Sequence, residues 1–211
     1  MLLVSNGCSH PAGAELEYPQ QGECYNKAWP RYLADDLDLD HINISMAGAS
    51  THRIVRTTYE FIYDWVKQRK DTKELLFIIL WPGTHRTEVY CDDSHIYNYD
   101  NRWAPIVVGN DSSYKKVFST SLYNYYKAWT TNTTEYQSSS DFYIDVTNLQ
   151  NLFYRYGIKH LFMDATNSGL LTMDKTLDKY RIHIDKKYYE GFDNRDNCYV
   201  NLCKYSNQKI S

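Results

Sequence analysis

Three turns, each placed directly after an apolar segment, carry the residues of this 211-residue chain whose types and spacing suit chemistry. Ser9 follows the apolar segment Leu2–Val4 and lies in the turn Gly7-Cys8-Ser9. Gly48 and Thr84 lie in two later turns of the same kind. A strand that ends in a glycine turn places the next side chain at the carboxyl edge of a sheet, where open α/β folds bind ligands. A serine at that edge can meet a substrate carbonyl, although it can equally be a capping residue of an ordinary turn.

The elements that must position these turns alternate between strand and helix patterns. The segment Leu75–Trp81 is apolar without alternation, which is typical of a central strand with both faces covered. The pattern predicts a doubly wound parallel sheet of order 2-1-3-4-5 flanked by helices, a three-layer α/β sandwich. The expected strands are 2–4, 42–46, 75–81 and 158–163, and the expected helices are 26–38, 51–69, 112–129 and 138–156.

The chain shows no linker and no repeat, so we expect a single domain over residues 1–211. A tyrosine-rich excursion interrupts the alternation at about 86–130, and residues 88–110 have no clear period. We interpret 88–110 as irregular, as a lid or a substrate wall. The chain from about Asp193 is expected to be weakly structured.

Composition excludes several classes of function. The net charge of -3 gives no electrostatic reason for binding nucleic acid or an anionic membrane, so we expect neither partner. Five cysteines without a CxxC pair predict free thiols rather than a disulfide framework or a zinc site. With neither a signal peptide nor a transmembrane segment, a cytoplasmic location is expected.

The three turns resemble blocks of the SGNH (GDSL-like) hydrolase family. Gly7-Cys8-Ser9 is similar to the nucleophile block, with Cys8 where aspartate is usual, and 45–50 is similar to the glycine block. Residues 81–85 stand where the third block is expected, without its usual asparagine. The resemblance implies an esterase with Ser9 as nucleophile and an oxyanion hole made by the Ser9 and Gly48 N–H groups with the Thr84 hydroxyl. The likeness is greatest to phage-type members that begin Gly-Cys-Ser-His-x-Ala-Gly, which implies a phage-encoded protein made in the host cytoplasm.

The chain departs from this family where the general base should be. The family ends in Asp-x-x-His, and the one histidine after residue 165 is His183, without an aspartate at that spacing. A serine without a base is a weak nucleophile. The chain is therefore expected to be inactive alone, to be completed by another chain, or to use a substitute histidine. His183 ranks first as the substitute, and His85 and His10 are alternative bases or oxyanion donors.

Two other functions compete with the esterase. A non-catalytic binding module on the same scaffold would use the tyrosine-rich excursion to hold a sugar or a protein. A flavodoxin-like nucleotide binder would cradle phosphate with the Ser9 loop, but the chain lacks a glycine-rich phosphate motif. For the esterase we expect a small ester or an acylated carbohydrate as substrate, with no metal and no organic cofactor.

Overall fold

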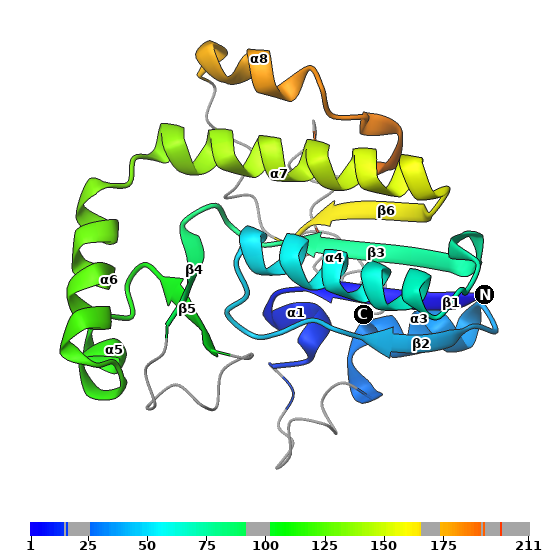
Figure 1. Ribbon diagram of the computed structural model, residues 1–211, viewed down its shortest axis with the longest axis horizontal. Helices are drawn as coiled ribbons and strands as arrows, with labels where there is room; N and C mark the ends of the chain where they lie inside the picture. The colour runs from blue at the N-terminus through cyan, green and yellow to red at the C-terminus, as the bar shows by residue number, and fades with distance from the viewer. Residues whose placement is uncertain are drawn as a thin grey trace, which may run out of the picture.

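The computed structural model describes residues 1–14, 16, 26–91, 102–165, 174–190, 192 and 199. A five-stranded sheet of order β2-β1-β3-β6-β7 forms its centre (Figure 1), and every pairing in it is parallel. The predicted α/β class and strand order are therefore confirmed. The strands are β1 (Leu2–Gly7), β2 (Asp40–Asn43), β3 (Leu75–Trp81), β6 (Lys159–Asp164) and β7 (Tyr189–Glu190).

The central position of β3 follows from its sequence. It pairs with β1 on one side and with β6 on the other, and six of its seven residues are buried. Alternate residues of a strand point to opposite faces, so an unbroken apolar run needs cover on both. Phe77 and Ile79 pack on one face, whereas Ile78 packs on the other.

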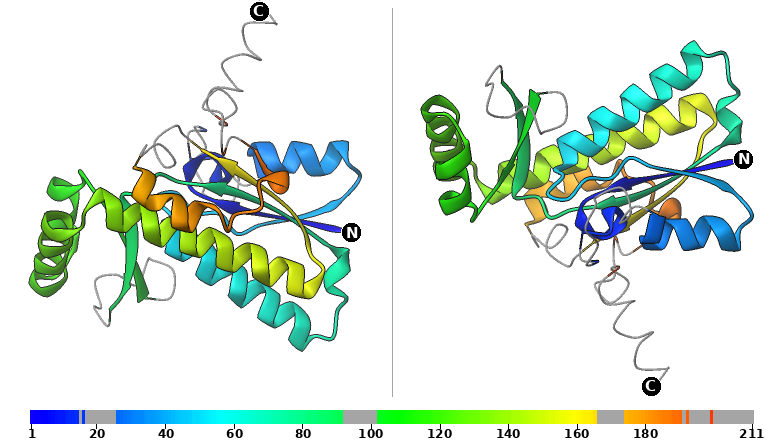
Figure 2. Two further views of the ribbon diagram at one scale, coloured as in Figure 1. Left: turned by 90° about the horizontal axis from the view of Figure 1, so that it is seen from above. Right: turned by 90° about the horizontal axis from the view of Figure 1, so that it is seen from below.

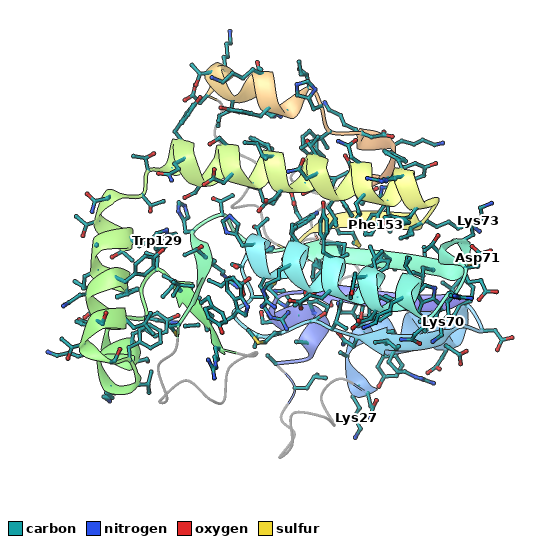
Figure 3. The ribbon with its side chains drawn as sticks, viewed as in Figure 1. Lys27, Lys70, Asp71, Lys73, Trp129 and Phe153 are labelled. Carbon is teal, nitrogen blue, oxygen red and sulfur yellow. The ribbon has the colours of Figure 1, made fainter. Side chains whose placement is uncertain are left out.

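Helices provide this cover on both faces (Figure 2). Helices α4 (Thr51–Lys67) and α7 (Glu135–Tyr156) lie on one face, and α3 (Trp29–Asp36) lies on the other. From α7, Phe153 points toward the sheet (Figure 3) and its ring centroid lies 5.0 Å from that of Phe77. One hydrophobic cluster contains Phe77 and another contains Ile78, on opposite faces of the sheet. The sheet and the helices packed on its two faces therefore make a three-layer sandwich.

Several element boundaries differ from those predicted. The second strand starts at Asp40 and ends at Asn43, although Ile44 and Met46 still donate backbone hydrogen bonds to β1. The last long helix begins at Glu135 rather than at 138, because the Thr134 hydroxyl accepts the N–H of Gln137 and caps it. Gly157 ends that helix in the left-handed conformation, as expected.

The excursion forms a lobe with its own small core. Strands β4 (Arg86–Tyr90) and β5 (Trp103–Val107) pair antiparallel, so the prediction of irregular structure over 88–110 was wrong for these two segments. The predicted helix 112–129 is two helices, α5 (Asp111–Val117) and α6 (Thr120–Asn132), because Phe118 is extended and Ser119 caps α6. In Figure 3, Trp129 projects from α6 toward the hairpin.

Short elements complete the described chain. They are α1 (Ser9–Ala12), the 3-10 turns η1 (Thr72–Glu74), η4 (Lys175–Leu177) and η5 (Lys186–Tyr188), and α8 (Asp178–Arg181). Of the residues predicted to be weakly structured from Asp193, all but Tyr199 lie outside the described residues. Across the described helices, none has the length and apolar character needed to cross a membrane.

Candidate functional site at the carboxyl edge of the sheet

The turn that carries Ser9 depends on a glycine at the end of β1. A Cβ atom at Gly7 would lie 2.7 Å from the Leu80 carbonyl oxygen and 2.7 Å from Pro11 Cγ, so no larger residue fits. Helix α1 starts at once after this contact, with half-buried Ser9 as its first residue. The close approach of β1, β3 and α1 therefore fixes the Ser9 backbone at the carboxyl edge.

The Gly48 turn is joined to the end of the same strand. Met46 donates its N–H to the Gly7 carbonyl at 3.1 Å, and Ala49 donates to the Met46 carbonyl at 3.0 Å. Gly48 has a φ of +77° at the third position of this turn, a conformation that favours glycine. The turns that carry Ser9 and Gly48 therefore lie at adjacent strand ends, joined by the hydrogen bond from the Met46 N–H to the Gly7 carbonyl.

Buried Asn6 fixes α4 against the end of β1. Its side-chain amide donates to the Ile54 carbonyl at 3.1 Å and to the hydroxyls of Thr57 and Thr58 at 2.9 and 3.0 Å. Its Oδ1 accepts the Gly7 N–H at 2.8 Å. A single side chain thereby positions the first turns of α4 relative to the Ser9 turn.

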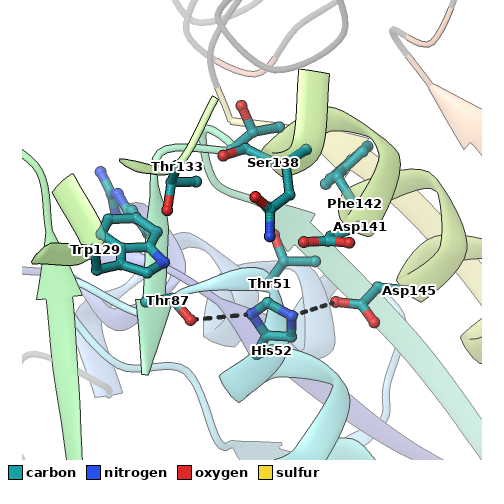
Figure 4. Close-up of a pocket in the computed structure, with 12 residues that line it drawn as sticks. Thr51, His52, Thr87, Trp129, Thr133, Ser138, Asp141, Phe142 and Asp145 are labelled. Carbon is teal, nitrogen blue, oxygen red and sulfur yellow. Dashed lines mark hydrogen bonds and ion pairs between the residues drawn. The ribbon is translucent and has the colours of Figure 1, made fainter. Parts of the chain in front are cut away.

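Thr84 follows β3 and lines a pocket between this edge and the lobe. Figure 4 shows this pocket with nine of its other lining residues labelled. A volume of about 30 Å³ in the pocket is open to the centre of a water molecule. The residues that line it are mostly polar: Thr51, His52, Thr84, Arg86, Thr87, Trp129, Thr133, Gln137, Ser138, Asp141, Phe142 and Asp145. The predicted oxyanion donor Thr84 therefore shares a pocket with an imidazole and two carboxylates.

The imidazole of His52 lies between a hydroxyl and a carboxylate (Figure 4). Its Nδ1 is 3.3 Å from Thr87 Oγ1, and its Nε2 is 3.7 Å from Asp145 Oδ2. The pKa of Asp145 is raised to about 6, chiefly by burial; nearby His52 lowers this pKa, and Asp141 contributes to raising it. A hydroxyl, an imidazole and a carboxylate in this order can pass a proton.

Charge links the pocket to the Ser9 turn. Burial raises the pKa of the Cys8 thiol, and the guanidinium of Arg86, which lines the pocket, lowers it. The charge of Arg86, a residue that lines the pocket, therefore acts on Cys8, the residue before Ser9.

None of the three histidines predicted from the sequence as bases, His183, His85 and His10, lines the pocket of Thr84. His183 is exposed and lines a separate cavity with α7 residues, including Tyr143 and Thr147, and no residue of the Thr84 pocket lines that cavity. His85 is exposed next to Thr84, and the centroid of the His10 ring lies 5.3 Å from that of Tyr199, with the two rings tilted by 44°. Within the described residues, no imidazole hydrogen-bonds to the Ser9 hydroxyl.

His52 and Asp145 were missed by reasoning from the sequence. His52 opens α4 and reads as structural there, and Asp145 lies 93 positions away on α7. The available signal was Asp141 and Asp145 at a spacing of four, which places both carboxylates on one helical face. No group of three or more metal-ligating side chains occurs in the described part of the chain.

Residues 16–196 match the model of a family described as a family of unknown function, DUF6071. The chain belongs to this family. No curated protein matches this DUF6071 chain.

Two solved structures show a distant likeness. The acetyl xylan esterase AlAXEase is 12% identical with a TM-score of 0.39, over 100% of this chain and 84% of that chain. A protein assigned as a GDSL-like lipase from Parabacteroides merdae ATCC 43184 is 12% identical with a TM-score of 0.35, over 86% and 70% of the two chains. Because both scores are below 0.5, the α/β assignment rests on the strand order and pairings described above.

Proposed function

We propose that this DUF6071 member is a serine hydrolase of the SGNH kind that cleaves a small ester or an acylated carbohydrate. Ser9 attacks the carbonyl carbon. The N–H groups of Ser9 and Gly48, with the hydroxyl of Thr84, hold the oxyanion that forms. This chemistry needs no metal and no organic cofactor.

The hydrogen bond from the Met46 N–H to the Gly7 carbonyl carries this proposal. It joins the turn after β2 to the turn after β1. Strand β3, which precedes Thr84, pairs with the other side of β1. Serine attack on an ester needs a nucleophile and oxyanion donors from different strands at one edge, held before the substrate arrives. The neighbouring positions of β2, β1 and β3 in the sheet support this arrangement for the three turns.

Labelling and turnover test the nucleophile together. We expect a fluorophosphonate probe to label Ser9, and Ser9→Ala to abolish both labelling and hydrolysis of p-nitrophenyl acetate, since the variant lacks the attacking oxygen. Ser113→Ala, an exposed serine on α5, is the matched control and should retain both. Turnover that survives Ser9→Ala would refute Ser9 as nucleophile.

A binding module is the second candidate, favoured by the surface of the lobe. Tyr90 and Tyr125 are 52% and 43% exposed and line a cavity of about 480 Å³ with Val89, Cys91, Ser119, Ser121 and Leu122. Exposed aromatic faces beside hydroxyls suit a sugar ligand. Saturable binding of an oligosaccharide that Tyr125→Ala weakens, without any turnover by the unaltered chain, would favour this function over hydrolysis.

A further inference from the structure

We propose that His52, held between Asp145 and Thr87, is the general base of the carboxyl-edge pocket and takes a proton from the water that attacks an ester carbonyl bound against Thr84. This inference rests on the proposed ester hydrolysis. It supplies the base that the sequence lacks in its expected C-terminal position.

The contacts of the ring assign its basic nitrogen. An ionised carboxylate only accepts hydrogen bonds, so the Nε2 atom that faces Asp145 carries the proton. The lone pair is then on Nδ1, which faces the Thr87 hydroxyl at 3.3 Å. The Thr87 hydroxyl has a second acceptor in the Glu88 carbonyl at 3.5 Å, so it can turn away and leave Nδ1 open to water.

The carboxylate of Asp145 can accept a further hydrogen bond. Among the described residues, the buried Oδ2 atom of Asp145 has no hydrogen-bond partner, and His52 Nε2 at 3.7 Å is just beyond hydrogen-bonding range. Contacts of this kind shorten when substrate binds and a positive charge develops on the ring. An acceptor that is buried and unpaired costs free energy until a donor reaches it.

The pocket has room for the attacking water. Roughly 10–15 Å³ suffices for one water molecule, and about 30 Å³ is open here. Thr84 lines the same space, so a carbonyl oxygen held by its hydroxyl places the carbonyl carbon beside the water and the base. The position of His52 is fixed relative to the end of β1, because the Asn6 side chain hydrogen-bonds to the turn of α4 that follows His52.

Two further charged groups face the pair. Asp141 lines the pocket from α7, and Arg86 lines it from β4. Asp145 must be ionised to stabilise the imidazolium. Because the pKa of Asp145 is about 6, we expect turnover to fall as the pH drops below about 6.

The proton balance of the step is complete. The water oxygen bonds to the carbonyl carbon, and its proton moves to His52 Nδ1. When the tetrahedral intermediate collapses, the bond to the leaving oxygen breaks, and His52 returns the proton to that oxygen. The products are a carboxylic acid and the free hydroxyl, which belongs to Ser9 where an acyl-enzyme is hydrolysed.

The test compares His52→Gln, Asp145→Asn and Ser9→Ala for p-nitrophenyl acetate turnover across pH 5–9. We expect His52→Gln to lower kcat at least about 100-fold, the usual scale of a general base. Added imidazole should restore part of the turnover of His52→Ala. Asp145→Asn should lower kcat at least about tenfold at constant KM and remove the inflection near pH 6. His41→Gln, at the amino-terminal edge of the sheet, is the matched control.

The outcomes separate this inference from the proposed function. Turnover that needs Ser9 but is unchanged in His52→Gln would overturn His52 as base and leave the serine hydrolase standing. Turnover that needs His52 but survives Ser9→Ala would support the base and overturn Ser9. Absence of turnover in the unaltered chain on a panel of esters would overturn both.

Discussion

The body around the parallel sheet and the lobe of β4, β5, α5 and α6 are stabilised by different kinds of core. In the body, large apolar residues from consecutive strand positions are fully buried, as Ile79 and Leu80 illustrate. The lobe has a smaller cluster centred on Tyr114, Phe118 and Tyr126. Tyr114 stacks on Phe118 at 4.2 Å, and its hydroxyl accepts the Val107 N–H. The core of the body is larger than that of the lobe and resists opening more, so we expect the lobe to be the less stable region.

The candidate site lies where these two regions meet. Arg56 of α4 donates to both carboxylate oxygens of Glu88 on β4 at 2.8 and 2.9 Å, and its guanidinium lies 4.6 Å from the Trp103 ring. His52 comes from the body side of this junction, and Thr87 comes from the lobe side. The imidazole therefore comes from a helix of the body, and the hydroxyl comes from a strand of the lobe, the region that we expect to be less stable.

The largest effects are expected from opening each core in turn. Phe77→Ala should lower the global free energy of unfolding by about 3–5 kcal/mol, because it leaves a cavity in the body. Tyr114→Ala should instead lower the opening free energy of the lobe by roughly 2–4 kcal/mol. Urea unfolding measures the first change, and amide hydrogen exchange resolved by segment measures the second. Equal loss of protection in β3 and the lobe after Tyr114→Ala would show that the two are one cooperative unit.

The fold of the body could be predicted from the sequence because its buried positions are occupied by apolar residues. The run 75–81 has no polar position, so its central place in the sheet followed from hydrophobicity alone. Strand β4 shows the opposite. Its Glu88 side chain is only 5% exposed, but an ion pair with Arg56 makes that burial tolerable. A strand that buries a charge has no apolar alternation, so the hairpin was read as irregular.

The site was predicted in part for the same reason. Ser9, Gly48 and Thr84 come after the parallel neighbours β1, β2 and β3, so the prediction that they share one edge could be made from topology alone. The contact of His52 with Asp145 joins two helices and depends on their packing. No local pattern around His52 encodes that contact, and His183 was ranked above it on chain position alone.

A pH-dependent effect is expected at the carboxyl end of β6, which holds a buried acid. The Tyr189 hydroxyl donates to Asp164 Oδ1 at 2.6 Å, and burial raises the pKa of Asp164 to about 8. The folded chain therefore binds a proton that the unfolded chain releases near pH 4, so stability falls as pH rises from about 4 to about 8. Asp164→Asn keeps an acceptor for Tyr189 and should stabilise the protein increasingly over that range. A difference in thermal midpoint that stays constant between pH 4 and pH 8 would contradict the raised pKa.

The smallest expected effect comes from two matched helix caps, one in each region. Ser50 Oγ accepts the Arg53 N–H at 3.1 Å at the start of α4, and Ser119 Oγ accepts the Leu122 N–H at 3.3 Å at the start of α6. Because the two bonds are chemically alike, Ser50→Ala and Ser119→Ala should each remove about 1 kcal/mol of helix stability.

The two cap variants should differ in where that loss is seen. Helix α4 packs on the sheet through Ile54 and Ile62, so Ser50→Ala should lower the urea midpoint of the whole chain. Helix α6 packs on the lobe core through Leu122 and Tyr126, so Ser119→Ala should speed amide exchange in α5 and α6 and leave the midpoint nearly unchanged. Ser→Asp at each position retains a capping oxygen and should restore stability. Equal shifts of the urea midpoint in both alanine variants would mean that the lobe and the body unfold together, as one cooperative unit joined across the ion pair between Arg56 and Glu88.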